Sequence, residues 1–380
     1  MVENNEKMYL ELLDFDTDKK EKWVKQRLPY SVLFELTARC NMNCVHCYLQ
    51  NVHDTKELSY DKIIEIIDIL YEKGIVFLTF TGGEILLRKD FVDIYLYAKK
   101  KGFLVELFTN GYLFDDKIID ALAEYPPLLV DISLYGASEN TYRKVTGLQN
   151  AFARVIQNCK KLKKAGIRVS LKSPPIIDLT YPEIKDMQML ADKLQIPFVY
   201  TFEICNTIDR QDMPKMHQIS LNKALEYEFA NHYKQIQTEG RKSKSNYDEI
   251  INELRTNEKV YSCNVAVNSF VVDYNGKMCP CMKLRHRGIK LEKNNYEKIW
   301  SDFKKYSAQI ATMDYKCKGC EALYYCDVCP AEMDFLYNDP EYRPENACKC
   351  AYIRKAFYEN KISFDEALAE AKENEKGGII

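Results

Sequence analysis

The chain has 380 residues, 46% of them apolar and 29% charged, with a formal net charge of −2. This apolar share excludes a mainly disordered protein, and the length suits one large domain with a smaller one. Without a basic surplus to neutralise phosphates, nucleic acid is not an expected partner. The sequence lacks a secretory signal and any run approaching the roughly 18 apolar residues of a membrane helix. We therefore expect a soluble, cytoplasmic protein with no membrane partner.

Strand and helix patterns alternate after a polar N-terminal extension (residues 1–29). The first helix is predicted to begin at the N-cap Ser59 and to stop at Gly74. The predicted strands are 31–37, 76–81, 103–109, 128–135, 168–173 and 197–204, and the later predicted helices are 90–101, 115–125, 150–165 and 181–194.

Six strand–helix units in sequence predict an α/β fold whose parallel sheet has right-handed crossovers. A doubly wound sheet and a barrel both fit this rhythm. Six units fall short of the eight in a complete barrel, which favours an open, partial (β/α)6 TIM-like barrel. We assign it residues 30–235, followed by a polar linker (236–262), a small cysteine-rich domain (263–350) and a helical tail (351–380).

The 14 cysteines are grouped rather than scattered, with three at 40–47, nine between 263 and 350, and only Cys159 and Cys205 alone. Structural disulfides are not expected in the cytoplasm. The grouping indicates metal ligands. Cys159 fits a core position within a helix, and Cys205, at the end of the sixth strand, is either a buried thiol or a catalytic one.

The first group, Cys40-x3-Cys44-x2-Cys47, follows a predicted strand directly. Zinc sites usually have four ligands, whereas three thiolates can bind three irons of a cubane cluster and leave the fourth iron open. The alternatives are a zinc loop completed by a distant residue and three buried thiols.

This motif, with His46 before its last cysteine and with TGGE at 81–84 ending the second strand, resembles the radical SAM superfamily over about residues 30–235. The resemblance implies a [4Fe-4S] cluster on the three cysteines, with S-adenosyl-L-methionine (SAM) bound at its open iron. Gly82, Gly83 and Glu84 would hold the methionyl ammonium, since glycine lets a backbone approach a ligand closely.

The resemblance implies further SAM contacts by His46 of the cysteine motif, Asn110 at a strand end, Ser133 and Arg143, with Ser173 or Lys172 as additional candidates. An arginine can donate two parallel hydrogen bonds to a carboxylate, although Arg143 also fits a solvated position. The implied reaction is reductive cleavage of SAM to a 5′-deoxyadenosyl radical that abstracts hydrogen from a substrate. A reducing partner such as flavodoxin or ferredoxin would supply the electron.

The second group contains Cys263, Cys279, Cys281, Cys317, Cys320, Cys326, Cys329, Cys348 and Cys350. Its two C-x2-C pairs are typical of zinc, but the five-residue gap between them is short for a zinc ribbon. The array resembles the SPASM domain, which implies two auxiliary [4Fe-4S] clusters. The outer one would use Cys317, Cys320, Cys326 and either Cys348 or Cys350. The inner one would use Cys263, Cys279, Cys329 and either Cys281 or an open iron.

The resemblance implies an oxidoreductase or maturase that crosslinks or oxidises a side chain of a ribosomal precursor peptide or protein. A separate peptide-recognition protein is a possible partner. The alternatives are a dehydrogenase or epimerase acting on a small molecule, such as a sugar or cofactor precursor, and a non-catalytic iron–sulfur electron carrier or sensor. No residue pattern identifies a general base.

Overall fold

The computed structural model describes residues 23, 26–52, 56–173, 175–220, 222–230, 258–261 and 263–375. The chain forms two compact units. The barrel unit comprises Ser31–Ala224 and Phe270–Glu297, and the C-terminal unit comprises Met1–Tyr30, Leu225–Ser269 and Lys298–Ile380. Most of the predicted N-terminal extension and of the predicted linker lies outside the described residues, so the domain boundaries stay predictions.

The barrel unit is built on six parallel strands that pair in sequence order, as predicted. They are β1 (Ser31–Thr37), β2 (Phe77–Gly82), β3 (Leu104–Thr109), β4 (Leu129–Ser133), β5 (Val169–Ser173) and β6 (Phe198–Tyr200). The last is shorter than its predicted range. Three strands that were not predicted extend the sheet beyond β1 as an antiparallel ribbon: β7 (Ser269–Val272), β8 (Lys277–Cys279) and β9 (Ile289–Lys290).

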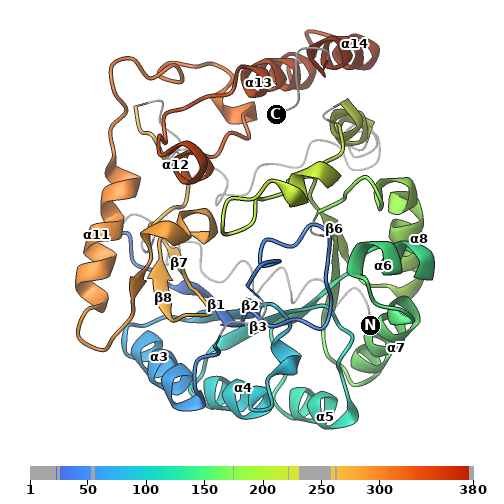
Figure 1. Cartoon of the computed structure of the whole chain (residues 1–380), viewed down its shortest axis with the longest axis vertical. Coiled ribbons are helices and arrows are strands. Elements are labelled where there is room, and N and C mark those ends of the chain that lie inside the picture. Colours follow the sequence, from blue (N-terminus) through green and yellow to red (C-terminus); the bar gives the residue numbers. More distant parts are fainter. Residues whose placement is uncertain are drawn as a thin grey trace. The chain divides into compact units, whose positions relative to one another are not determined.

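The helices of the barrel unit follow the predicted order: α3 (Tyr60–Glu72), α4 (Phe91–Lys100), α5 (Asp116–Glu124), α7 (Ala151–Lys164) and α8 (Ile184–Leu194), with 3₁₀ turns η1 (Ile85–Leu87), η2 (Tyr181–Glu183), η3 (Met213–His217) and η4 (Met282–Arg287). Figure 1 shows α3, α4, α5 and α7 following one another along one side of the sheet. A doubly wound fold would place helices on both faces, so this arrangement confirms the partial barrel.

Helix α6 (Glu139–Thr146) was not predicted, because its eight residues are mostly polar and only Tyr142 and Val145 contribute large apolar groups to its buried face. Local signals define it instead. The side chain of the N-cap Ser138 accepts a hydrogen bond from the backbone of Thr141, and Gly147 ends the helix in the left-handed region.

The C-terminal region is more helical than its turn-rich sequence indicates. It contains α11 (Tyr296–Ala308), η5 (Leu323–Tyr325), α12 (Pro330–Tyr337), α13 (Glu345–Tyr358) and α14 (Phe364–Glu375). The last lies within the predicted helical tail (351–380), whose boundaries stay a prediction. No helix in the described part of the chain has both the length and the apolar character needed to cross a bilayer.

The barrel strands separate apolar and polar side chains onto opposite faces. Fully buried residues such as Phe34, Phe80, Leu107 and Ile132 alternate with polar residues along the same strands. Gly111 packs against both Ile132 and Val155 of α7, so the apolar face is the one covered by helices. The opposite, inner face of the barrel is therefore polar.

The predicted cap of α3 is confirmed, since the Ser59 side chain accepts a hydrogen bond of 3.3 Å from the backbone N–H of Lys62. We expect Ser59→Ala to lower the free energy of unfolding by about 1 kcal/mol, because that N–H loses its partner. Urea denaturation would measure the change. Ser59→Asp keeps an acceptor and should leave stability near that of the wild type; equal losses in both variants would contradict the capping role.

Candidate cofactor site

The three cysteines of the first motif lie on the loop that follows β1, with Cys44 buried and the other two half-buried. Burial, with a smaller contribution from a neighbouring acidic group in each case, raises the pKa of Cys40 to about 12 and that of Cys47 to about 11. Burial and the two other thiols also raise the pKa of Cys44. Thiols in this setting become thiolates only beside positive charge, which iron would supply.

No three His, Cys, Asp or Glu side chains among the described residues converge closely enough to chelate a single metal ion. Cubane ligands each bind a different iron and therefore stand farther apart than the ligands of one zinc ion. Three thiols on one loop can each bind a different iron of such a cluster and leave the fourth iron open.

The glycine motif at the end of β2 packs directly against the backbone that leads into the cysteine loop. The N–H of Gly83 donates to the Thr37 carbonyl at 2.8 Å, and the N–H of Glu84 donates to the Arg39 carbonyl at 2.8 Å. A Cβ atom at Gly82 would lie 2.2 Å from the Thr37 carbonyl oxygen. Gly82 also has a φ of +126°, so glycine is required here both by space and by backbone conformation.

The Glu84 carboxylate is completely buried and connects β2 to the end of β3. It accepts hydrogen bonds from the Leu86 N–H (3.0 Å), the Thr109 hydroxyl (2.7 Å) and the Asn110 N–H (2.7 Å). Burial raises the pKa of Glu84 even though these three bonds act in the opposite direction. The contact of this carboxylate with the methionyl ammonium stays a prediction.

Asn110 lies beside the first cysteine of the loop. Its side-chain NH₂ donates to the Asn41 carbonyl oxygen at 2.8 Å and is 3.9 Å from Cys40 Sγ. Its own side-chain oxygen accepts a hydrogen bond from the Tyr112 N–H at 3.0 Å. The structure therefore brings Asn110, the glycine motif and the cysteine loop together, although they are separated in sequence.

His46 has its ring 5.5 Å from the ring of Tyr135, centroid to centroid. Burial lowers the pKa of His46 to about 4, so its imidazole is neutral at pH 7. Its Nδ1 is buried and finds no hydrogen-bond partner among the described residues. Tyr135, which no motif singles out, also hydrogen-bonds the Cys44 thiol. A tyrosine two residues beyond Ser133, at a strand end, is the signal that could have found it.

The other residues predicted to contact SAM differ in how far their side chains are exposed. Ser133 is partly buried at the end of β4, where its carbonyl accepts a hydrogen bond of 3.1 Å from the Tyr142 hydroxyl. Ser173 is buried, and Lys172 forms an ion pair with Asp131 on the inner face of the barrel. Arg143 is exposed on α6. The roles of all four in binding SAM stay predictions.

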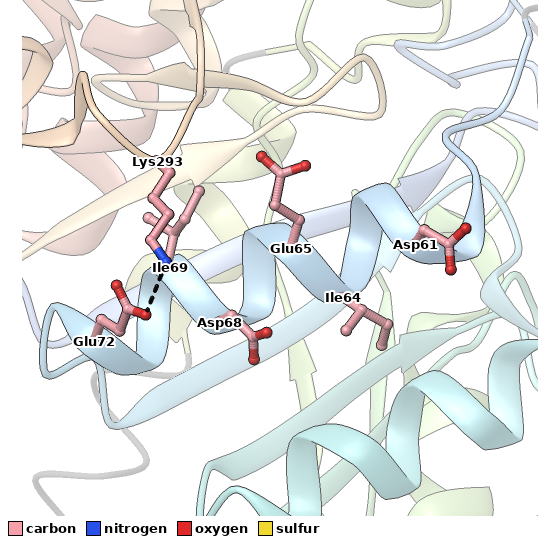
Figure 2. Close-up of a pocket in the computed structure, with 7 residues that line it drawn as sticks. All are labelled: Asp61, Ile64, Glu65, Asp68, Ile69, Glu72 and Lys293. Carbon is pink, nitrogen blue, oxygen red and sulfur yellow. Dashed lines mark ion pairs between the residues drawn. The ribbon is translucent and has the colours of Figure 1, made fainter.

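A surface pocket on the outer side of α3 is separate from this site (Figure 2). Lys293 reaches over the helix and forms an ion pair of 3.6 Å with Glu72. The pocket contains none of the predicted cofactor ligands; its lining is Asp61, Ile64, Glu65, Asp68, Ile69, Glu72 and Lys293.

The cysteines of the second motif are divided between the two units. The barrel unit holds Cys279, which is buried, and Cys281, which is half-buried. The C-terminal unit holds the other seven: Cys263, Cys317, Cys320, Cys326, Cys329, Cys348 and Cys350. The predicted inner set draws on both units and stays a prediction.

Four cysteines of the C-terminal unit lie within electrostatic reach of one another. Burial, followed by the charges of Cys326, Cys348 and Cys320, raises the pKa of Cys317 to about 12. The Arg343 guanidinium donates to Cys317 Sγ at 3.1 Å. Which of Cys348 and Cys350 completes the predicted outer set stays a prediction.

Comparison with known proteins identifies the barrel unit. The sequence pattern of the radical SAM superfamily matches residues 34–191. A probable GTP 3′,8-cyclase of Sulfolobus acidocaldarius is 30% identical over 246 residues, which are 63% of this chain and 71% of that protein. The AdoMet-dependent heme synthase of Methanosarcina barkeri is 25% identical over 345 residues, 83% of this chain and 97% of that protein.

The antilisterial bacteriocin subtilosin biosynthesis protein AlbA of Bacillus subtilis is 30% identical over 162 residues, but these are 42% of this chain and 36% of AlbA. The chain likewise spans less than half the length of several other curated relatives.

Among solved structures, Streptococcus suis SuiB bound to the precursor peptide SuiA superposes with a TM-score of 0.65 at 17% identity, covering 87% of this chain and 79% of that one. This match shows a shared fold. With the cysteine loop, the glycine motif and the parallel barrel all present, the chain belongs to the radical SAM superfamily, whose members bind a [4Fe-4S] cluster and SAM.

Proposed function

We propose that this enzyme uses SAM-derived radical chemistry to crosslink or oxidise a side chain of a ribosomally made peptide or protein. The observation that carries the radical chemistry is the packing of Gly82, Gly83 and Asn110 against a loop of three cysteines. The peptide substrate is supported by the similarity to AlbA, a protein of bacteriocin biosynthesis.

Cys40, Cys44 and Cys47 would hold the cluster, and the glycine motif with Asn110, His46 and Ser133 would hold SAM. When bound, the cluster and SAM supply a radical that removes a hydrogen atom from the substrate. The cysteines of the C-terminal unit would hold auxiliary clusters, and a flavodoxin or ferredoxin would be the reductant.

Anaerobic co-expression with each short peptide encoded beside the gene, followed by mass spectrometry, tests the proposal. We expect one peptide to lose paired hydrogens, with the bond located by fragmentation. Cys40→Ala should abolish the change, whereas Cys159→Ala, which removes a buried thiol of α7, should retain it. Unmodified peptides, from an enzyme that still converts SAM to 5′-deoxyadenosine, would overturn the peptide substrate.

A small-molecule substrate is the second candidate, because the heme synthase is similar along 83% of this chain. Modification of a tetrapyrrole in the same anaerobic assay, with every peptide unchanged, would favour it. Formation of 5′-deoxyadenosine in either assay would exclude a non-catalytic electron carrier.

A further inference from the structure

A charged group on the inner face of the barrel lies below the strand ends that carry the cofactor site. It consists of Glu106 on β3, Asp131 on β4 and Lys172 on β5, with Thr79 on β2 beside it. The strand register pairs Thr79 with Glu106 and Phe108 with Asp131. Because side chains two residues apart share a strand face, Glu106 and Asp131 point to the same side of the sheet.

Each carboxyl has one fixed partner, and the buried Oδ1 of Asp131 is left without one among the described residues. The Thr79 hydroxyl donates to Glu106 Oε2 at 3.0 Å. The Lys172 ammonium forms an ion pair with Asp131 Oδ2 and lies 4.1 Å from the centroid of the Phe108 ring. The Asp131 side chain is only 1% exposed, and its Oδ1 has no hydrogen-bond partner among the described residues. A proton shared with the facing carboxyl of Glu106 would satisfy that oxygen.

The charges of the group do not balance when both carboxyls are ionised, because two negative charges face a single ammonium. Burial, followed by the charge of Asp131, raises the pKa of Glu106 to about 7, while Lys172 and Thr79 act in the opposite direction. Burial and the like charge of Asp131 therefore favour a protonated Glu106 carboxyl near neutral pH.

The group is partly accessible to solvent, since the Lys172 side chain is 32% exposed and Glu106 is only half-buried. Asn110 follows Glu106 by four residues and Ser133 follows Asp131 by two. At about 3.3 Å per residue, the carboxyls lie roughly 13 Å and 7 Å along the strands from those predicted SAM contacts. A substrate that reaches down the barrel from the cofactor would contact Glu106.

We propose that the Glu106 carboxylate, facing Asp131 and held beside Lys172, is the proton acceptor for the substrate. The substrate class is one that carries an exchangeable N–H, O–H or S–H next to the carbon that loses hydrogen. This inference rests on the radical chemistry of the proposed function. The substrate gives one hydrogen atom to the cofactor-derived radical, one electron to an oxidised iron–sulfur cluster and one proton to Glu106, which amounts to the loss of two hydrogens.

The first test follows the carboxyl groups of the full-length protein by infrared pH titration, without substrate. In the wild type we expect a protonated carboxyl that ionises near the pH 7 indicated for Glu106. Glu106→Gln should remove this signal, and Asp131→Asn should move it to lower pH, because the like charge is gone. The matched control Glu124→Gln, on the exposed end of α5, should keep it. Absence of this signal from the wild-type protein would contradict the interaction between the Glu106 and Asp131 carboxyls.

The second test measures modified peptide formed per 5′-deoxyadenosine formed. We expect Glu106→Gln to lower this ratio roughly 100-fold, as the loss of a proton acceptor does, and Glu124→Gln to leave it unchanged. The glutamine can still accept from Thr79 and donate to Asp131, so folding should be retained. An unchanged ratio in Glu106→Gln would overturn the role. If the wild type modifies no peptide, the proposed function fails. The infrared titration then tests by itself whether Glu106 and Asp131 form an interacting carboxyl pair.

Discussion

Gly83→Ala is expected to lower the free energy of unfolding by about 3 kcal/mol and to prevent cluster assembly. The added Cβ would lie 2.2 Å from the Arg39 carbonyl oxygen and 2.7 Å from that of Ala38. Both atoms are backbone, so the clash is relieved only if the chain entering Cys40 moves. Urea denaturation would measure the stability, and iron analysis of the purified protein would measure the cluster.

Gly74→Ala is the matched control, because a Cβ at Gly74 meets no atom within 4 Å. Its φ of +76° still makes alanine unfavourable, by about 1–2 kcal/mol. We expect this variant to keep its full iron content. Gly83→Ala protein with wild-type stability and iron would show that the loop tolerates displacement and that the close packing is dispensable.

The main features of the cofactor site could be predicted from the sequence because they depend on local patterns. Cys40 and Gly82 each stand at the end of a predicted parallel strand, and the ends of neighbouring parallel strands meet at one edge of a sheet. The apolar alternation of β1 to β5 is likewise a local property. Helix α6, with its polar sequence, has no such pattern and was missed.

Contacts between distant segments could not be predicted. The pairing of Glu106 with Asp131 depends on strand register, which no single strand specifies. The predicted strand 31–37 contains Glu35, an acid that is completely buried in the structure. Its partner, Arg285, lies 250 residues away within an unpredicted 3₁₀ turn, so nothing in the first segment indicates the second.

Arg285→Met is expected to lower the free energy of unfolding by about 3–5 kcal/mol, because it leaves the Glu35 charge buried without its counter-ion. The Arg285 guanidinium makes two hydrogen bonds to Glu35, one of them 2.7 Å long, and lies over the Tyr48 ring at 5.1 Å. The Tyr48 hydroxyl also donates to Glu35 at 2.7 Å. In the variant, the completely buried Glu35 carboxylate keeps the Tyr48 hydroxyl as a donor but loses both hydrogen bonds from the guanidinium. Urea denaturation would measure the loss.

The triple variant Glu35→Leu, Tyr48→Phe, Arg285→Met separates charge from packing. It removes the two buried charges and the hydrogen bonds described among these three side chains while keeping the apolar volume, and such replacements are often neutral or stabilising. We therefore expect stability close to that of the wild type. Tyr48 follows Cys47 directly, so iron content provides a second measurement. In the single variant we expect the unpaired Glu35 charge to displace Tyr48 and the cysteine loop, with loss of the cluster. The triple variant should retain the cluster. If the triple variant is as unstable as Arg285→Met, the arginine acts through its packing, and the unpaired charge is not the cause.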